Sequence, residues 1–397
     1  MPTRKPSDLI VVGAGVVGAA CAHYAARAGL TVTVVDRGSV SGGTTGAGEG
    51  NLLVSDKEPG PELELALLAT SLWRELAEEL PERVEYEAKG GLVVAAGEAG
   101  MGALREFAAR QEKAGVTAQE IPGDRLHDLE PHLAHGLAGG YRYPQDAQVM
   151  PAHAAAHLLR TGGDRVRLRL GEEVVGLLTG ASGEIRGVRT TAGELHAPYV
   201  VNAAGTWGGT LAGLAGVHLP VMPRRGFVLV TEPLPRVVRH KVYAADYVAD
   251  VASGSAALQT SAVVEGTPAG PVLIGASRER VGFDRSLSTE VLRRLAAGAT
   301  ALFPVLATVR AMRTYLGFRP YLPDHLPAIG PDPRVPGLLH ACGHEGAGIG
   351  LAPVTGRIIA ACLTGDRPPL DIDPFRPDRF AAPESPAAPG SPAASER

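Results

Sequence analysis

The sequence predicts an α/β fold, and its N-terminal segment carries the strongest evidence. An apolar run at 9–12 leads into Gly13-Ala14-Gly15-Val16-Val17-Gly18, an alanine-rich helical stretch, a second apolar run at 31–35 and then Asp36. This order of strand, glycine turn, helix and strand is a βαβ unit of the Rossmann-like type that binds dinucleotides. Later segments predict further strands and a closing helix of the same domain: 199–205, 338–341 and 353–364.

Each glycine of the βαβ unit has a predicted purpose. Gly13 permits the tight turn out of the strand, Gly15 lets the backbone approach a pyrophosphate, and Gly18 lets the helix pack closely on the sheet. The N-terminus of the helix then directs unsatisfied N–H groups at the phosphates. Asp36 follows at the spacing of the acid that accepts hydrogen bonds from an adenosine ribose.

Length and composition narrow the class of protein. A chain of 397 residues exceeds the usual size of a single core, so we expect two closely packed domains. No apolar run is long enough to cross a bilayer, and residues 1–7 leave no room for a signal peptide, so the expected location is the cytoplasm. Net charge is −4 and the arginines are scattered, which argues against a nucleic-acid surface.

The cysteines and histidines predict no metal site. Cys21, Cys342 and Cys362 share no Cys-x-x-Cys spacing, which excludes an iron–sulfur cluster or a cysteine zinc site built by this chain alone. So few cysteines also fit a reducing compartment. The histidines show no spacing typical of metal ligands.

The order of the segments predicts that the dinucleotide-binding domain is discontinuous. Helices and strands alternate in the first part of the chain, whereas strands dominate between about 224 and 317. We therefore expect a dinucleotide-binding domain from 1–83, 146–222 and 326–372, and a second, mostly antiparallel β-sheet domain from 84–145 and 223–325. Residues 376–397 are rich in Pro, Ala and Ser and are expected to be a disordered tail.

Four separated motifs resemble the D-amino acid oxidase-like flavoproteins. They occur in the family's order: Gly13 to Gly18; Asn202-Ala203-Ala204-Gly205-Thr206-Trp207; Gly317-Phe318-Arg319-Pro320 with Pro323-Asp324 and Gly330; and Gly343-His344-Glu345-Gly346. The resemblance spans roughly residues 8 to 370 and is strongest to the branch of glycine oxidase, sarcosine oxidase and the amino-acid-oxidising subunits of hydroxyproline, opine and cyanide-forming dehydrogenases. It implies an FAD-binding domain of the glutathione-reductase type and a separate substrate domain.

The resemblance also implies which residues hold FAD. The segment 343–350 would direct N–H donors at the flavin N1–C2=O edge, which stabilises negative charge on the reduced ring. No cysteine lies near Arg319, so the FAD is expected to be noncovalent. The cofactor-binding residues implied in this way are Gly13, Gly15, Val16, Val17, Gly18, Asp36, Arg37, Gly43, Thr44, Thr45, Gly50, Asn51, Leu52, Val174, Ala203, Gly205, Trp207, Gly317, Gly343, His344, Glu345, Gly346, Ala347, Gly348 and Ile349.

Four residues are candidates for the substrate site. In the family the arginine of Gly-x-Arg-Pro, here Arg319, makes a two-pronged contact with a substrate carboxylate, a geometry that a planar guanidinium supplies. Tyr243 or Tyr247 would add a hydroxyl to that carboxylate, and His344 would affect proton balance near the flavin. A structural arginine, core tyrosines and a structural histidine are the alternatives for these positions.

The resemblance implies oxidation of the C–N bond of a small amino acid or N-substituted glycine. Hydride passes from the α-carbon to flavin N5, and the imine hydrolyses to an oxo acid or to glyoxylate and an amine. One alternative is the catalytic subunit of a heteromeric D-hydroxyproline or opine dehydrogenase that passes electrons to a partner. Others are a 2-hydroxy acid or glycerol phosphate oxidoreductase on the same fold and a non-catalytic flavin-binding protein.

The electron acceptor and the oligomeric state stay open at this stage. Sarcosine oxidases place a lysine over the flavin to activate oxygen, but no lysine follows Lys241 in this chain. Oxygen, a quinone and a partner protein are therefore all retained as acceptors. A homo-oligomer is one of the assemblies that the sequence allows.

Overall fold

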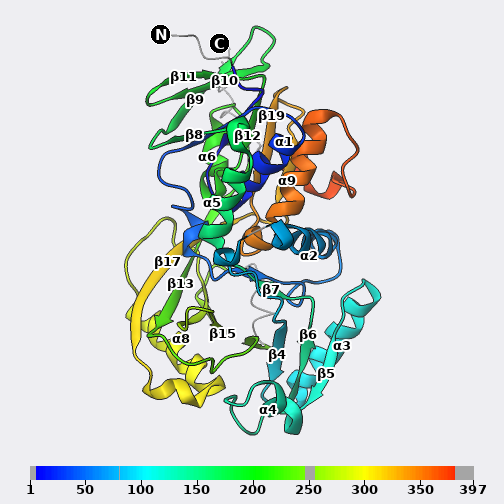
Figure 1. The fold of residues 1–397 in the computed structure, drawn as a ribbon, viewed down its shortest axis with the longest axis vertical. Helices are drawn as coiled ribbons and strands as arrows, with labels where there is room; N and C mark the ends of the chain where they lie inside the picture. The colour runs from blue at the N-terminus through cyan, green and yellow to red at the C-terminus, as the bar shows by residue number, and fades with distance from the viewer. Residues whose placement is uncertain (1–5, 80, 246–254, 381–397) are drawn as a thin grey trace, which may run out of the picture.

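The computed structural model describes residues 6–79, 81–245 and 255–380, which form an upper and a lower region in Figure 1. The upper region is built on a six-stranded sheet of order β18-β19-β12-β1-β2-β8. β1 runs parallel to β2 and β12, and β2 runs parallel to β8. The strands are β1 (Leu9–Val12), β2 (Val32–Asp36), β8 (Val166–Leu170), β12 (Tyr199–Asn202), β18 (Ala328–Pro331) and β19 (Leu338–Cys342). The predicted α/β fold is confirmed.

Small residues let the helices of the upper region pack closely. A Cβ added to Gly356 would lie 2.6 Å from the backbone of Ala20, so α9 and α1 approach almost to backbone contact. Such close approach maximises dispersion contacts in the core. The helices are α1 (Val16–Arg27), α2 (Pro61–Glu79), α5 (Pro151–Thr161), α6 (Gly208–Gly213) and α9 (Gly348–Thr364).

The lower region is an eight-stranded sheet of order β17-β13-β16-β15-β14-β4-β6-β5. Its pairings are antiparallel except that β14 runs parallel to β4. The strands are β4 (Gly91–Ala95), β5 (Gln119–Pro122), β6 (Gly139–Tyr143), β13 (Met222–Thr231), β14 (Lys241–Ala244), β15 (Gln259–Gly266), β16 (Val272–Arg278) and β17 (Ala311–Tyr321). Its strands come from two separate stretches of the chain, 91–143 and 222–321, so β13 starts one residue before the range 223–325 predicted for the substrate domain.

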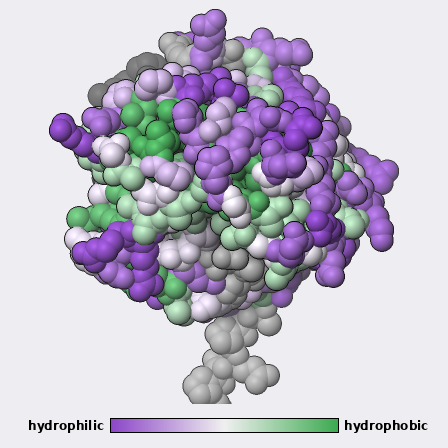
Figure 2. Space-filling model, turned by 90° about the horizontal axis from the view of Figure 1, so that it is seen from below, coloured by the Kyte–Doolittle hydropathy of each residue, from purple (hydrophilic) through white to green (hydrophobic). Residues whose placement is uncertain are grey.

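Helices cover the lower sheet and give it a core of its own. α8 (Thr289–Leu302) begins after Ser288, whose hydroxyl accepts a hydrogen bond from the N–H of Val291. Its buried face packs with side chains of β13, β15 and β16. α3 (Glu98–Lys113) and α4 (Leu126–Leu129) lie on the other half of the sheet. Viewed from below, this end of the molecule shows small hydrophobic patches between hydrophilic side chains (Figure 2).

Two small sheets complete the fold. β9 (Val174–Thr179), β10 (Ile185–Thr190) and β11 (Gly193–His196) form an antiparallel meander at the top of Figure 1. β3 (Asn51–Leu52) pairs with β7 (Ala147–Gln148) where the two regions meet. No helix in the described ranges is both long and apolar enough to cross a lipid bilayer.

Two sequence predictions of boundaries need correction. The closing helix starts at Gly348 rather than at Pro353, which lies inside α9. Proline there forgoes one backbone hydrogen bond, but Leu351 and Ala352 before it are buried in the core and hold the extra turn. The tail predicted from 376 onward is placed against the body as far as residue 380, because Arg379 forms an ion pair with Asp324. Residues 381–397 lie outside the described residues.

Candidate active site

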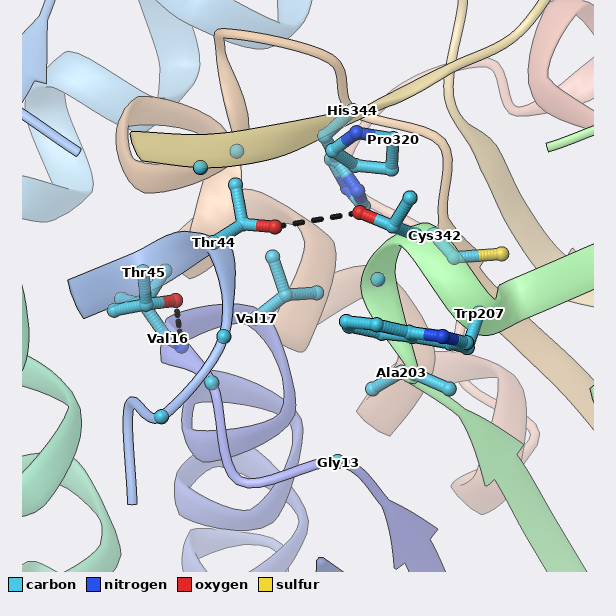
Figure 3. Close-up of a pocket in the computed structure, with 18 of the residues that line it drawn as sticks. Gly13, Val16, Val17, Thr44, Thr45, Ala203, Trp207, Pro320, Cys342 and His344 are labelled. Atoms are coloured by element: carbon cyan, nitrogen blue, oxygen red, sulfur yellow. Dashed lines mark hydrogen bonds between the residues drawn. The ribbon is translucent and has the colours of Figure 1, made fainter. Parts of the chain in front are cut away.

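A cavity of about 460 Å³ lies between the upper sheet and the inner face of β13 and β17. Its walls come from segments far apart in the sequence: the turn after β1, the end of β2, residues 39–51, the turn after β12, and the segment before α9. Figure 3 shows the turn after β1, the loop with Thr44, the turn after β12 and the segment before α9 around the cavity. The arrangement follows from the parallel sheet, because the carboxyl ends of its strands open at one edge.

The glycine turn has the tight packing that its sequence predicted. Gly13 has φ of +117°, and a Cβ there would lie 2.3 Å from the carbonyl oxygen of Ala203. A Cβ on Gly18 would lie 1.9 Å from the carbonyl oxygen of Gly13, so α1 can sit this close to β1 only with glycine at this position. The N–H of Val16 donates to Thr45 Oγ1 at 3.0 Å, which ties the start of α1 to the following loop (Figure 3).

Asp36 and Arg37 form one end of the cavity. The Asp36 carboxylate accepts hydrogen bonds from the N–H groups of Ala14 and Gly38, each at 2.8 Å. The Arg37 guanidinium lies over the Trp207 ring, 4.0 Å from its centroid. A carboxylate held in this way keeps lone pairs for a ribose hydroxyl, and the cation stacked on the indole gives that end a flat, rigid wall.

Threonine side chains fix the second domain against the first. Thr44 Oγ1 donates to the carbonyl oxygen of Phe318 at 2.6 Å, and Thr206 Oγ1 donates to the same oxygen at 2.8 Å. Phe318 precedes Arg319 on β17, so these bonds set the position of the arginine relative to the glycine turn. Thr44 lies in a short 3₁₀ helix (Thr44–Ala47) and Thr206 in another (Gly205–Trp207).

Arg319 lines the cavity from the second domain. Its Nη1 donates to the carbonyl oxygen of Ser277 at 2.8 Å. A Cβ on Gly226 of β13 would lie 2.2 Å from Nη1, so the guanidinium extends across a position that only glycine leaves open. Backbone atoms thus hold the Arg319 guanidinium in a fixed orientation. Binding of a carboxylate through two hydrogen bonds requires such a fixed guanidinium.

The segment before α9 places a neutral imidazole and a charged carboxylate beside the cavity. His344 is buried, its Nε2 lies 3.0 Å from Thr355 Oγ1, and burial lowers its pKa to about 3. Burial by itself would raise the pKa of Glu345, but the hydrogen bond from His325 and the charge of Arg224 lower it to about 2. His344 is therefore neutral and Glu345 ionised near pH 7.

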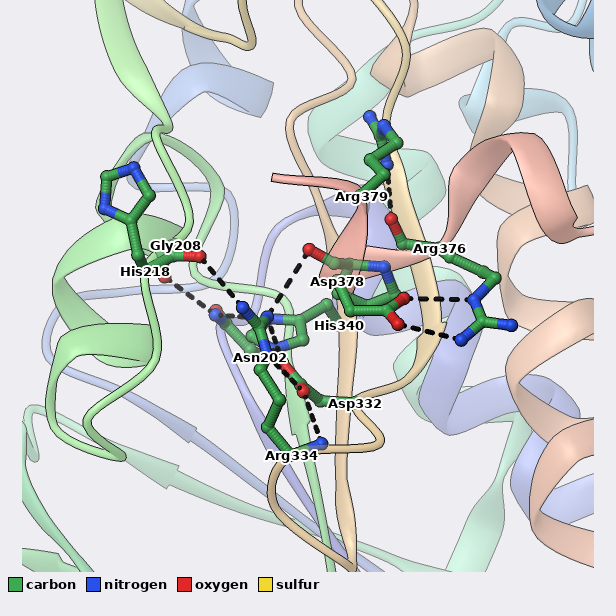
Figure 4. A network of polar contacts seen from close by, with 10 residues as sticks. Asn202, Gly208, His218, Asp332, Arg334, His340, Arg376, Asp378 and Arg379 are labelled. Atoms are coloured by element: carbon green, nitrogen blue, oxygen red, sulfur yellow. Dashed lines mark hydrogen bonds and ion pairs between the residues drawn. The ribbon is translucent and has the colours of Figure 1, made fainter. Parts of the chain in front are cut away.

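A buried polar network supports the turn after β12 (Figure 4). Asn202 Nδ2 donates to the carbonyl oxygen of Gly208 at 2.8 Å and lies 3.1 Å from His340 Nδ1. His340 Nε2 lies 3.1 Å from Asp332, which also binds Arg334 at 2.7 Å. The network joins Asn202 at the end of β12 to His340 of β19 and to Asp332, which directly follows β18, and so ties these three strands together.

Most of the residues predicted to hold the cofactor meet at this cavity. Those that line it are Gly13, Gly15, Val16, Val17, Asp36, Arg37, Gly43, Thr44, Thr45, Asn51, Val174, Ala203, Gly205, Trp207, Gly317, His344, Glu345, Gly346, Gly348 and Ile349. Those that do not line it are Gly18, Gly50, Leu52, Gly343 and Ala347. The glycines of the second group support the wall: a Cβ on Gly50, for example, would lie 2.0 Å from the carbonyl oxygen of Val149.

Of the two predicted tyrosines the structure describes only Tyr243, and it does not line the cavity. Tyr243 is fully buried, and its hydroxyl donates to Ser55 Oγ, which in turn donates to Asp146. Burial raises the pKa of Tyr243 well above its usual value. The structure therefore gives Tyr243 the core position that was its alternative. Tyr243 pairs with Val263 and Val263 with Gly275, so the three share one face of the sheet, but the Tyr243 hydroxyl is bound by Ser55 and the side chain does not line the cavity. Tyr247 lies outside the described residues.

Several lining residues were missed by reasoning from the sequence. They are Glu49, Glu172, Thr206, Thr210, Leu211, Gly226, Val228 and Cys342. Thr206 falls within a quoted motif and Glu49 within a glycine-rich loop, so both carried a local signal. Gly226 and Val228 carried none, because their place in the cavity depends on the pairing of β13 with β17.

A dinucleotide cradle that shares one cavity with a charged group from a second sheet defines an oxidoreductase of the two-domain flavoprotein class. A sequence profile described as FAD dependent oxidoreductase (DAO) matches residues 8–362. The chain therefore belongs to this family, and its cofactor is FAD.

Individual relatives agree with this assignment. Hydrogen cyanide synthase subunit HcnC of Pseudomonas aeruginosa is 31% identical, over 95% of this chain and 97% of the relative. Glycine oxidase of the same organism is 30% identical, over 93% and 98%. The crystal structure of glycine oxidase from Geobacillus kaustophilus matches with a TM-score of 0.86 and 28% identity, covering 95% of this chain and all of that one.

Proposed function

We propose that this protein oxidises the C–N bond of a small amino acid or N-substituted glycine with FAD as the hydride acceptor. The observation that carries the proposal is Arg319, a guanidinium from the substrate domain held by backbone contacts in the same cavity as the glycine turn. Relatives named glycine oxidase support an amino acid rather than another anion.

The described residues fit an FAD molecule along the whole cavity. The glycine turn leaves backbone N–H groups at the start of α1 accessible to a pyrophosphate, and the N-terminus of α9 opens at the other end. Asp36 supplies acceptors for a ribose. Bound FAD supplies a ring that accepts two electrons as a hydride. The proposed cofactor-binding residues are those predicted from the sequence, with Gly18, Gly50, Leu52, Gly343 and Ala347 acting through the backbone they position.

We expect the cofactor to be noncovalent. Cys342 is the cysteine that lines the cavity, and burial raises the pKa of its thiol to about 12. A Cβ on Gly208 would lie 2.7 Å from Cys342 Sγ, so the sulfur is packed under the turn after β12. A buried, protonated thiol is a poor nucleophile, and formation of a thioether at this residue is disfavoured.

The chain's own residues contribute orientation and exclusion of water rather than acid–base groups. Arg319 fixes the carboxylate of the substrate and thereby the direction of the bond to be oxidised. His344 stays neutral, so it packs beside the cavity without adding charge. Phe318 and Pro320 flank Arg319, and both are buried, which limits water on that side of the site.

A second candidate function differs in the electron acceptor. The relative HcnC is named as a subunit of a larger enzyme, which supports a catalytic subunit that passes electrons to a partner protein. Oxygen and a quinone remain acceptors to test. A 2-hydroxy acid oxidoreductase would use the same arginine on a different bond.

The proposal is tested by product analysis of the purified FAD-loaded protein with glycine, sarcosine, D-proline and larger N-carboxymethyl amino acids. Reactions run in air and, separately, without oxygen but with an artificial dye acceptor. An oxo acid or glyoxylate formed with equimolar ammonia or amine, or the cyclic imine in the case of D-proline, supports amine oxidation. Turnover with the dye alone supports the dehydrogenase. Product from glycolate or lactate and from none of the amines would contradict the proposal.

A further inference from the structure

Glu49 is a buried carboxylate at the cavity to which neither the family motifs nor the fold gives a purpose. It lies between the two glycines of Gly48-Glu49-Gly50, lines the cavity and is only 8% exposed. Burial of an ionised carboxylate costs free energy unless cations or donors satisfy it. The hydrogen bonds of its two oxygens therefore show whether the surrounding residues supply the donors or cations that this carboxylate needs.

The two oxygens of Glu49 are unequally satisfied. Oε2 accepts a hydrogen bond from Asn51 Nδ2 at 3.2 Å. Oε1 is buried and has no hydrogen-bond partner among the described residues. Within those same residues no nitrogen of lysine, arginine or histidine lies within 4.0 Å of the carboxylate. Residues 6–79, 81–245 and 255–380 thus leave one oxygen of this carboxylate without a donor.

The surroundings of Glu49 are rich in acceptors. Asn51 Oδ1 and Gln148 Oε1, from paired positions of β3 and β7, are also buried without a partner. The hydroxyl of Tyr315 donates to the carbonyl oxygen of Gly48 at 3.3 Å, so it is engaged beside Glu49. Burial, and after it the charge of Glu49, raise the pKa of Tyr315. A ligand that donates hydrogen bonds or carries positive charge fits this side of the cavity.

Glu49 and Arg319 both contact the strand β16. A Cβ on Gly275 would lie 2.1 Å from Glu49 Oε1, and Arg319 Nη1 donates to the carbonyl oxygen of Ser277, two residues further along β16. Gly226 leaves space for the guanidinium, as Gly275 does for the carboxylate. A negative side chain from the first domain and a positive side chain from the second thus line one cavity beside β16.

We infer that Glu49 binds the cationic nitrogen of the substrate while Arg319 binds its carboxylate. This inference rests on the proposed function and sharpens it: the ligand class is the zwitterion of an α-amino acid or a secondary α-amino acid. Such a molecule presents a carboxylate and an ammonium group separated by one carbon atom. A 2-hydroxy acid matches Arg319 equally well but offers Glu49 no positive charge, so the pair selects amines over alcohols.

The test compares ligands that differ only at the nitrogen. Sarcosine and methoxyacetate share size and carboxylate, but the second has an ether oxygen in place of the ammonium group. Glycine with glycolate, and D-proline with tetrahydrofuran-2-carboxylate, make the same comparison. Dissociation constants are measured from the visible spectrum of bound FAD without oxygen, for the wild type, Glu49→Gln and Glu265→Gln.

Glu49→Gln keeps the size of the side chain and an acceptor for Asn51 while removing the charge. We expect amine binding to weaken by about 10- to 100-fold, as for loss of a charged hydrogen bond, with the oxygen analogues unchanged. Glu265→Gln is the matched control. Glu265 is fully buried on the neighbouring strand β15 and also has an unpartnered oxygen, but it does not line the cavity. It should not alter the preference for amines.

Gly275→Ala provides a second variant that retains the charge. Its methyl group must displace the Glu49 carboxylate, so amine binding should weaken while the oxygen analogue again binds as in the wild type. Equal effects on both ligands of a pair, or no effect of Glu49→Gln on amines that do reduce the wild-type flavin, would overturn the role of Glu49. Failure of every amine to reduce the wild-type flavin would instead overturn the proposed function.

Discussion

Replacement of Arg319 by methionine removes the guanidinium while keeping a long, flexible side chain. In the structure the arginine is partly buried, and Nη1 is held by the carbonyl oxygen of Ser277 at 2.8 Å. Loss of one partner of a desolvated charge pair costs roughly 2 to 5 kcal/mol. Since 1.36 kcal/mol is a factor of ten, binding of a carboxylate substrate should weaken by roughly 30- to 5,000-fold.

Binding of FAD serves as the internal control for Arg319→Met. Thr44 and Thr206 bind the carbonyl oxygen of Phe318, so β17 should keep its position and the cofactor should remain bound. The assay is anaerobic titration of the flavin spectrum with the best amine and with its carboxylate-only analogue. Both should bind more weakly by a similar factor. Unchanged dissociation constants in a variant that retains FAD would remove Arg319 from carboxylate binding.

Three further predictions concern the cofactor cradle and the segment before α9. Gly18→Ala places a methyl group against the carbonyl oxygen of Gly13, which should cost about 1 to 3 kcal/mol or more and lower the FAD content; full FAD occupancy with unchanged thermal unfolding would refute this. Because the pKa of Glu345 is about 2 in the folded protein and ordinarily 4.5, its charge stabilises the fold above about pH 4.5. That contribution, on the order of 3 kcal/mol, is lost as the pH falls toward 2. The free energy of urea unfolding of Glu345→Gln should therefore differ most from that of the wild type near neutral pH. A difference that does not change with pH would contradict the lowered pKa of Glu345. His344 is neutral above about pH 5, so His344→Gln should leave every inflection of kcat/KM between about pH 6 and 9 in place, and loss of one would show that the imidazole titrates there.

The dinucleotide-binding half could be predicted from the sequence because its determinants are local. The glycine turn, Asp36 and the alanine-rich helix lie within one supersecondary unit, and each glycine occupies the tight position that its spacing indicated. The order of the later motifs likewise predicted which loops gather at the carboxyl edge of the sheet. Arg319 was predicted as a site residue from the short motif Gly-x-Arg-Pro, and the structure places it at the cavity.

The substrate half could not be predicted in detail because it depends on strand register. Tyr243 shares a sheet face with Gly275 but lies on β14, two strands beyond β16, and nothing in the local sequence of β14 gives its place in the sheet. The position of the Glu49 carboxylate depends on its contact with Gly275, which lies on a strand distant in the sequence. Gly226 likewise could not be predicted to line the cavity, because its contact with Arg319 depends on the pairing of distant strands. Contacts of this kind appear only when the eight-stranded sheet is assembled.

The most direct test of the central claim is an anaerobic titration of the yellow, FAD-loaded protein with sarcosine, glycine and D-proline, compared with glycolate and lactate. The account predicts that at least one amine reduces the flavin stoichiometrically, that the hydroxy acids do not, and that the absorbance returns when air or the true acceptor is admitted. Reduction by a hydroxy acid and by none of the amines would contradict oxidation of a C–N bond at this site.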